Sequence, residues 1–539
     1  MERRDFLKSL MVAPALDSFD WDAFPDGVQA RGREGEFDAI IVGSGLGGLS
    51  CGFAFARKDF RPLVLEQHDR PGGYATSFAR PGGFVFDVSL HSTGAGRRGD
   101  LLNLIPGLPE ITEVEFVPHP HLYRAIFPEH DLRVQQRDVA GYIKLLTGYF
   151  PAEEAGIKGI IEDMEGLARD INKLSGGGSM PDMSRFSMQF PYLFKCQGKT
   201  WGQMADARIR DPKLKAIISN LWGYYGLPPS TLSCYYYALP TIGYLAEGGY
   251  YPRGTSQKIS SAIAKYIEDK GGKVLLRTPV KEILVEDRTA VGVRTADGRQ
   301  YTSRVVVSNA CAHDTFRTMM NETEYLKDYL GRLDSYSVSL SAFQVFLGLK
   351  TDLVRKLGIT DSEVFYHGGY DVEAEYQLAV SADVERGWYG LMLYDNLYQG
   401  YSPKGKNTLN IIVLQGYDHW KQFESDYREG KKSAYRAEKE RMAKALIGKV
   451  EDTLLPGLAK SIQVMEAGSP LTHARYTGNY RGAIYGWDQT LNNTGPTRLP
   501  HKTPIKNLYL AGAWTTPGHG YGGVIYSGLQ CFSEIMKAW

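Results

Sequence analysis

The sequence lacks the long apolar run that would cross a membrane. None of its segments approaches the roughly 18 consecutive apolar residues that a spanning helix needs. An excess of charge of one sign is also lacking, since 62 Lys and Arg stand against 61 Asp and Glu, for a net charge of +1. A nucleic-acid partner would require a strongly basic surface. We therefore expect a soluble or peripheral protein that binds no nucleic acid.

Cysteine is scarce, and its spacing excludes two kinds of site. No two of the cysteines have C-x-x-C spacing, so the sequence contains neither a zinc-cluster pattern nor a dithiol redox motif. We expect no metal site. We also expect buried free thiols rather than structural disulfides. The five positions are Cys51, Cys196, Cys234, Cys311 and Cys531.

The first 35 residues are interpreted as a leader. Residues 3–8 (RRDFLK) match the twin-arginine export pattern, and Ala13 and Ala15 could form a cleavage site. The apolar stretch between these two features is short, which favours a remnant leader instead. The sequence thus leaves open a cytoplasmic or peripheral membrane location and a twin-arginine route to the periplasm.

A strand–helix–strand unit follows the leader. Residues 37–42 form a nearly continuous apolar run, as a buried parallel strand does. Glycines come next, then apolar residues at helical spacing, and residues 61–66 form a second strand. The span of about 30 residues is that of a minimal unit of this kind. At 539 residues the chain is long enough for at least two domains.

The glycines between strand and helix indicate a dinucleotide site. Residues 43–48 (GSGLGG) give G-x-G-x-x-G. Gly43 makes the tight turn, Gly45 lets backbone approach a pyrophosphate, and Gly48 lets helix and strand pack closely. The free amides of the helix start then face the phosphates. Glu66, at the end of the second strand, can bind ribose hydroxyls and would repel a 2′-phosphate.

The residues after Glu66 favour FAD over NAD. Gly72 and Gly73 permit a second close backbone approach, as an extended two-nucleotide cofactor requires. The further matches to G-x-G-x-x-G, at residues 94–99 and 518–523, do not directly follow a predicted strand, so we do not expect a disulfide reductase with separate NAD and FAD domains. The sequence does not identify the electron donor or acceptor.

Further along, the pattern predicts elements of both types. We expect helices over 153–175, 256–270, 424–450 and 524–537, and a flexible glycine loop at 176–179. We expect strands over 273–277, 280–285, 290–295, 301–307 and 507–511, with a hairpin turn at Asp297-Gly298.

Four motifs resemble those of the flavin amine oxidase superfamily. They are the E-x5-G-G after the fingerprint, residues 249–255 (GYYPRGT), residues 510–514 (LAGAW) and residues 517–524 (PGHGYGGV). Residues 86–91 (FDVSLH) resemble the F-D-x-G-x-H of the branch with phytoene desaturases, carotenoid isomerases and retinol saturases, although Ser89 replaces its glycine.

The resemblance implies an α/β fold, in which a two-dinucleotide-binding (Rossmann-like) FAD domain carries an inserted mixed α+β substrate domain. The FAD domain would combine residues 36–95, 248–313 and 495–539, and the substrate domain residues 96–247 and 314–494. The resemblance implies that FAD is bound by the following residues: Gly43, Ser44, Gly45, Gly47, Gly48, Glu66, Gln67, Gly72, Gly73, Tyr74, Ala75, Val280, Gly512, Ala513, Gly522, Gly523 and Val524. Ala513 stands where many relatives have aspartate, so one ribityl contact is expected to be missing.

The candidate substrate region is aromatic. Trp222, Tyr224 and Tyr225 precede a run of tyrosines at 235–237, and rigid aromatic walls suit a long apolar ligand or a membrane face. The side chains that we expect to line the site are Tyr235, Tyr236, Tyr476 and Tyr485, with Arg475, Tyr480 and Arg481 as further possibilities. The acid–base candidates are His91 and His519.

We therefore expect an FAD-dependent oxidoreductase that desaturates, saturates or isomerises C=C bonds in a lipophilic isoprenoid or polyene, such as a carotenoid or retinoid. One alternative is a flavin amine or amino-acid oxidase. Another is a flavin-binding assembly or chaperone protein without turnover. Fold alone does not separate these functions.

Overall fold

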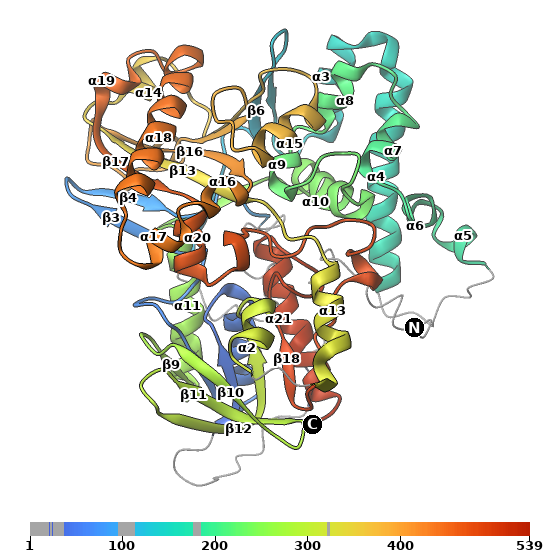
Figure 1. Ribbon diagram of the computed structural model, residues 1–539. Helices are drawn as coiled ribbons and strands as arrows, with labels where there is room; N and C mark the ends of the chain where they lie inside the picture. Colours follow the sequence, from blue (N-terminus) through green and yellow to red (C-terminus); the bar gives the residue numbers. More distant parts are fainter. Residues whose placement is uncertain (1–20, 22–23, 25–36, 95–113, 176–184, 321–323) are drawn as a thin grey trace.

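The computed structural model describes residues 37–94, 114–175, 185–320 and 324–539, together with Trp21 and Phe24. Two seven-stranded sheets organise this part of the chain, one at each end of the molecule (Figure 1). Trp21 and Phe24 fall within the predicted leader, and their rings pack against Phe53 and Phe532. The twin-arginine residues lie outside the described residues.

The first sheet carries the predicted strand–helix–strand unit. Its strands, in spatial order, are β10 (Val280–Glu286), β11 (Thr289–Thr295), β12 (Gln300–Ser308), β1 (Phe37–Val42), β2 (Pro62–Leu65) and β9 (Lys273–Leu275), and β18 (Leu508–Leu510) also pairs with β12. The pairs β9–β2–β1–β12–β18 are parallel, whereas β10, β11 and β12 form an antiparallel meander. These strands confirm the ones predicted from the sequence.

The two faces of β1 bury different layers, because successive side chains of a strand point to opposite faces. Ala39 and Ile41 pack against α2 (Leu46–Arg57), α11 (Ser256–Asp269) and α21 (Tyr521–Met536). Ile40 and Val42 pack on the other face, with residues of β10 and β11 and of α12 (Ala312–Arg317) and α13 (Lys327–Ser335). The parallel sheet is thus covered on both faces, as in other α/β proteins.

The second sheet is largely antiparallel. Its order is β17 (Ile462–Gly468), β13 (Ser341–Leu349), β16 (Asn407–Gln415), β15 (Tyr389–Met392), β14 (Glu363–Tyr366), β6 (Tyr123–Ile126) and β7 (Asp131–Val134). Phe343 and Val345 of β13 pack in the core that includes α18 (Ser433–Thr453). Ala342 and Gln344 point the opposite way, toward a cavity between the sheets.

A group of helices lies beside the second sheet (Figure 1) and shares a core with sheet residues such as Phe365 and Ile412. It contains α3 (Val139–Tyr149), α4 (Glu154–Ser175), α5 (Phe186–Gln189), α6 (Pro191–Cys196), α7 (Trp201–Asp206), α8 (Pro212–Ile218), α9 (Trp222–Tyr225) and α10 (Cys234–Glu247). The predicted helix at 153–175 is confirmed as α4. The glycine loop at 176–179 lies outside the described residues.

The remaining elements are short. Two antiparallel pairs complete the strands: β3 (Ser77–Arg80) forms a hairpin with β4 (Phe84–Asp87), and β5 (Phe116–Pro118) pairs with the distant β8 (Tyr250–Pro252). The other helices are α14 (Leu353–Lys356), α15 (Val372–Val380), α16 (Asp418–Lys421), α17 (Glu424–Arg428), α19 (Leu458–Ser461) and α20 (Pro470–Thr477), with 3₁₀ turns at Pro151–Glu153, Glu324–Leu326, Tyr394–Asn396, Tyr480–Gly482 and Gly495–Thr497.

Two expectations were wrong. The single charged helix predicted at 424–450 is divided into α17 and α18, because Gly430 between them adopts a left-handed φ of 82° that a helix cannot continue through. The structure also joins Cys196 and Cys234 in a disulfide, at the end of α6 and the start of α10. Cys51, Cys311 and Cys531 are buried free thiols, as expected. Over the described residues, no helix has both the length and the apolar character that crossing a bilayer demands.

Candidate active site

A cavity of about 1060 Å³ lies between the two sheets. One part of its lining comes from the carboxyl ends of β1, β2 and β12 and from the first residues of α2 and α21. The other part comes from α9, α10 and the inner face of the second sheet. Ligands of open parallel sheets bind in this position, outside the carboxyl ends of the strands.

Both helix starts in the lining leave their backbone donors free for a ligand. The N-caps of α2 and α21 are Gly45 and Gly520, and neither provides a side-chain hydrogen bond to its helix. The first turns also contain no acidic residue. An uncapped helix start carries about half a positive charge on its free N–H groups, so two such starts at one cavity favour an anionic ligand.

Glycine residues allow segments from the two ends of the chain to approach closely. Gly43 makes its turn at a φ of 92°, which side chains disfavour. A Cβ atom on Gly48 would lie 2.2 Å from the Gly43 carbonyl oxygen, so no side chain fits between this helix and strand. A Cβ atom on Gly47 would lie 2.7 Å from the Cα of Gly512, from the opposite end of the chain. The fingerprint and the C-terminal motif are therefore in direct contact.

Glu66 is held in place at the end of β2. Its Oε2 accepts hydrogen bonds from the backbone N–H of Ser44 (2.9 Å) and from the Ser44 hydroxyl (2.5 Å). Its Oε1 accepts from the backbone N–H of His68 (2.9 Å). The carboxylate still lines the cavity, where it is positioned to accept hydrogen bonds from ribose hydroxyls.

The structure gathers nearly all of the predicted site residues around this one cavity. Those that line it are Gly43, Gly45, Gly47, Glu66, Gln67, Gly72, Gly73, Tyr74, Ala75, His91, Tyr236, Val280, Tyr476, Tyr485, Gly512, Ala513, His519, Gly522, Gly523 and Val524. Ser44 and Gly48 lie behind the lining. Tyr235 points elsewhere, and its hydroxyl donates to the carbonyl oxygen of Leu193 (3.1 Å).

Comparison with known proteins supplies the family. Residues 46–536 match the family described as flavin containing amine oxidoreductase. The chain belongs to this family. It is therefore an FAD-dependent oxidoreductase, in the branch related to phytoene desaturases, carotenoid isomerases and retinol saturases, as the sequence predicted.

Two kinds of curated relative match almost the whole chain. The chloroplastic prolycopene isomerase of Daucus carota is 28% identical over 98% of this chain and 84% of its own. The all-trans-retinol 13,14-reductase of Rattus norvegicus is 27% identical over 93% of this chain and 86% of its own. A solved putrescine oxidase, at 14% identity, superposes with a TM-score of 0.62 over 93% of this chain and 99% of its own. The last likeness concerns the fold alone and confirms the predicted fold class.

The residues present fit FAD. Two uncapped helix starts suit its pyrophosphate and its flavin carbonyl, bare glycine backbone permits the approach, and Glu66 suits its ribose. FAD supplies hydride chemistry when it is bound. The protein's task is then to hold the cofactor, to select the substrate and to exclude water.

Two residues of this site were missed by the sequence analysis. The Asn309 amide lies between the glycine segments, and Cβ atoms on Gly45 and Gly512 would lie 2.7 and 2.4 Å from it. Arg498 is 2% exposed and donates to five backbone carbonyl oxygens, among them those of Ala513 (2.7 Å) and Thr515 (2.9 Å). Burial lowers the pKa of Arg498 to about 10, which leaves it charged at neutral pH. A buried cation thus braces the loop before α21.

His519 forms part of an aromatic group beside the start of α21. Its ring stacks on Tyr485 at 4.2 Å between centroids and contacts Tyr236 at 4.9 Å. The Tyr236 hydroxyl donates to the backbone oxygen of His519 (2.7 Å). Burial, with the nearby charge of Arg498, lowers the pKa of His519 well below its ordinary value. The imidazole is therefore neutral at pH 7, and its acid–base role stays a prediction.

His91 is positioned by a buried carboxylate. Asp87 accepts hydrogen bonds from the backbone N–H groups of Ser89 and Leu90, both 3.2 Å away, and this turn presents His91 to the cavity. Ser89 replaces the family's glycine without a positive φ, and its hydroxyl donates to the Tyr74 carbonyl oxygen (2.9 Å). Burial lowers the pKa of His91 to about 4, so this imidazole is also neutral at pH 7.

The candidate lining residues at 475–485 (Arg475, Tyr476, Tyr480, Arg481 and Tyr485) do not all reach the cavity. Tyr476 is 53% exposed at the cavity and stacks on His68. Tyr480 packs on His313 instead, and Arg481 pairs with Asp418. Within this group, Tyr476 and Tyr485 are therefore the side chains that border the site.

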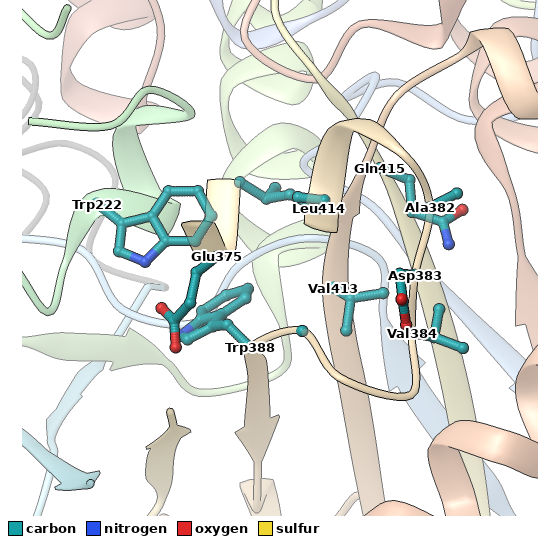
Figure 2. A pocket seen from close by; sticks show the side chains of 11 residues that line it. Trp222, Glu375, Ala382, Asp383, Val384, Trp388, Val413, Leu414 and Gln415 are labelled. Carbon is teal, nitrogen blue, oxygen red and sulfur yellow. The ribbon is translucent and has the colours of Figure 1, made fainter. Parts of the chain in front are cut away.

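A second cavity is too small for a substrate. Figure 2 shows Trp222, Glu375 and Trp388 grouped on one side of it and Asp383 and Gln415 on the other. Its volume is about 10 Å³, which is the room that a single water molecule requires. The chemistry therefore belongs to the large cavity.

Proposed function

We propose that this chain acts on C=C bonds of a lipophilic isoprenoid or polyene, such as a carotenoid or a retinoid, by desaturation, saturation or redox-neutral isomerisation. The observation that carries the proposal is the uncharged wall of the cavity opposite the glycine cradle. It consists of Tyr224, Tyr225, Tyr236, Leu239, Pro240, Ile242, Tyr244, Ala342, Ile412, Ile484 and Tyr485. Such a wall suits a long apolar ligand.

The relatives' names support this substrate class. One kind acts as a prolycopene isomerase and the other as an all-trans-retinol 13,14-reductase, and both align with nearly all of this chain. Among the described residues, charged side chains of the lining come from outside the uncharged wall. They are Glu165 and Arg169 on α4, Glu247 at the end of α10, Asp314 on α12, and Glu66 in the cradle.

We infer these roles for the residues that hold FAD. Gly43, Gly45, Gly48 and Glu66 hold the adenosine half, with Ser44 fixing the carboxylate and Val280 beside the adenine. Gly72, Gly73, Tyr74 and Ala75 border the pyrophosphate, and Gly47 and Gln67 complete this part. Gly512, Ala513, Gly522, Gly523 and Val524 hold the ribityl chain and the flavin ring. The supporting observation is that the lining combines these segments from both ends of the chain.

An amine oxidase is the main rival, because the family's fold also includes amine oxidases. An amino-acid oxidase would need a cation beside the flavin to anchor a carboxylate. The arginine of the described lining, Arg169, is on α4 rather than in the uncharged wall. The wall therefore favours a hydrocarbon over an amino acid.

The test uses FAD-loaded protein under anaerobic conditions. We expect poly-cis lycopene or all-trans-retinol to change its double-bond pattern, as followed by chromatography with oxidised and with dithionite-reduced protein. Putrescine and cyclohexylamine serve as the amine controls. Rapid bleaching of the flavin by these amines, with both polyenes unchanged, would contradict the proposal. A protein that holds FAD but turns over neither class would favour the assembly-protein alternative.

We further infer that the lipophilic substrate is collected at a membrane surface. Met188 on α5 and Phe194 on α6 are 74% and 54% exposed, and α6 packs on α4, which contributes to the cavity lining. Apolar side chains exposed on helices next to a cavity-lining helix suit a peripheral membrane contact. Replacement of both by serine should reduce co-sedimentation with phospholipid vesicles. Unchanged co-sedimentation of this variant would contradict the inference.

A further inference from the structure

A buried carboxyl group lies directly behind the uncharged wall. Glu363, the first residue of β14, is 2% exposed. Its Oε1 accepts a hydrogen bond from the hydroxyl of Tyr224, and Tyr224 lines the cavity. A carboxyl group buried in this way resists ionisation unless a cation balances it. Burial accordingly raises the pKa of Glu363 well above its ordinary value, which favours the protonated form of this carboxyl group.

The surroundings hold the Tyr224 ring in one orientation. It stacks on His91 with an interplanar angle of 6° at 6.2 Å, and it meets Phe365 edge-on at 5.5 Å. His91 is a neutral imidazole, so it does not compete as a proton source. The phenol can therefore present its hydroxyl to the cavity and to Glu363 without rearranging the wall.

The position of Tyr224 relates it to the cofactor end of the cavity. The neighbouring residue, Gly223, accepts a hydrogen bond through its carbonyl oxygen from the Tyr485 hydroxyl (2.7 Å). Tyr485 in turn stacks on His519, next to the start of α21. The backbone beside Tyr224 is thus connected, through one hydrogen bond and one aromatic contact, to the segment that we assign to the flavin.

The other carboxyl groups near the cavity already have partners or lie elsewhere. Glu66 is bound by Ser44 and His68. Asp87 accepts hydrogen bonds from the Ser256 backbone and hydroxyl, from the turn at Ser89, and from the hydroxyl of Tyr251, which is outside the lining of the cavity. Glu363 is instead bonded to a phenol of the wall, which makes it suited to proton transfer.

Resting on the proposed function, we propose that Tyr224 is the proton donor of the reaction and that Glu363 resupplies its proton. When a double bond is saturated, one carbon gains a hydride with its two electrons, which comes from reduced FAD. The other carbon gains the proton of the Tyr224 hydroxyl as that O–H bond breaks. The Glu363 carboxyl then returns a proton to the phenolate oxygen. In desaturation the same groups work in reverse, and Tyr224 accepts the proton.

The test is single-turnover reduction of all-trans-retinol by dithionite-reduced, FAD-loaded protein. Tyr224→Phe keeps the ring and removes the hydroxyl. We expect its rate constant to fall by about 10²- to 10⁴-fold, the usual contribution of general acid catalysis, with the Kd for retinol within threefold of wild type. The matched control is Tyr237→Phe, whose hydroxyl bonds the Ile218 backbone outside the lining and whose rate should stay within threefold. A Tyr224→Phe rate within threefold of wild type would overturn the proposal.

Glu363 has a readout that does not require turnover. The infrared spectrum of wild type minus Glu363→Gln should contain the C=O band of a protonated carboxyl group, and Glu363→Asp should retain such a band and most of the rate. A difference spectrum without that band overturns the proposal even if Tyr224→Phe is slow. If the wild type leaves both retinol and poly-cis lycopene unchanged, the proposed function fails. The infrared result then decides by itself whether Glu363 carries the proton that Tyr224 would need.

Discussion

Arg498 offers the sharpest test of how the protein braces its cofactor loop. Its guanidinium donates to the carbonyl oxygens of Trp487, Asp488, Asn493, Ala513 and Thr515 at 2.7–3.3 Å. We consider Arg498→Met, which keeps much of the volume and removes every donor. The carbonyl of Asp488 retains a second donor, the Asn493 side chain at 3.1 Å. The other four would lose the partner described here.

The magnitude follows from those four carbonyls. A buried acceptor left without a partner costs about 1–3 kcal/mol, and water entering the loop reduces that figure. At the lower end, four acceptors give about 4 kcal/mol. A stability of about 5–15 kcal/mol is typical of a folded protein, so the variant should fold while the loop before α21 loosens.

The assay measures FAD retention after gel filtration together with thermal unfolding in the presence and absence of FAD. We expect Arg498→Met to release most of its FAD and to lose the stabilisation that FAD gives wild type. Arg498→Lys, with three donors, should be intermediate. The matched control is Arg355→Met, at a side chain 78% exposed, which should change neither measurement. Full FAD retention and an unchanged Tm for Arg498→Met would refute the reasoning.

Three further predictions follow from the site. Gly48→Ala should abolish FAD binding, measured by absorbance after reconstitution, because its Cβ would lie 2.2 Å from the Gly43 oxygen; retained binding would contradict this close packing. His91 and His519 have lowered pKa values in the folded protein, so below about pH 6.5 the unfolded chain binds protons that the folded protein does not. The free energy of unfolding, measured with urea, should therefore be largest above about pH 6.5 and fall as the pH drops toward 4. A urea midpoint that does not change with pH over this range would contradict the burial of these two side chains. Asp87→Asn should loosen the turn before His91 and lower the Tm by several degrees in scanning calorimetry. Burial favours the neutral side chain, but the amide can accept fewer hydrogen bonds from the five backbone and hydroxyl donors that surround it. An unchanged Tm would contradict this role.

The cofactor half of the site was predictable because its geometry is local. A tight turn, a helix start and a strand end each follow from a few consecutive residues, so residues 43–48 and Glu66 could be assigned from spacing. The prediction that Gly512 belongs to the same site did not follow from spacing and came from a family resemblance. The exact domain boundaries stay a prediction.

The substrate half of the site was predicted less well, because composition does not show which way each side chain points. Tyr235, Tyr236 and Tyr237 are consecutive on α10, where each residue turns by about 100° from the last. Tyr236 alone of the three faces the cavity, while the hydroxyls of Tyr235 and Tyr237 donate to Leu193 and Ile218. A tyrosine run therefore predicts an aromatic region without telling which ring lines it.

Asn309 and Arg498 could not be found from local patterns. Asn309 reaches the cradle because β12 pairs with β1, which sets the two strand ends side by side. Arg498 binds backbone carbonyl oxygens, which every residue has, so its partners cannot be recognised from the amino-acid sequence. Polar residues immediately after a buried strand, such as Asn309, are nonetheless a usable signal once the strand order is known.

The central claim is that the glycine-rich starts of α2 and α21 bind one FAD molecule together. Titration of the FAD-free protein with FAD tests this claim most directly. The account predicts tight binding of one FAD per chain to wild type, and loss of that binding in Gly48→Ala and in Arg498→Met alike. A wild-type chain that binds no FAD, or that binds it equally well after both changes, would contradict the account.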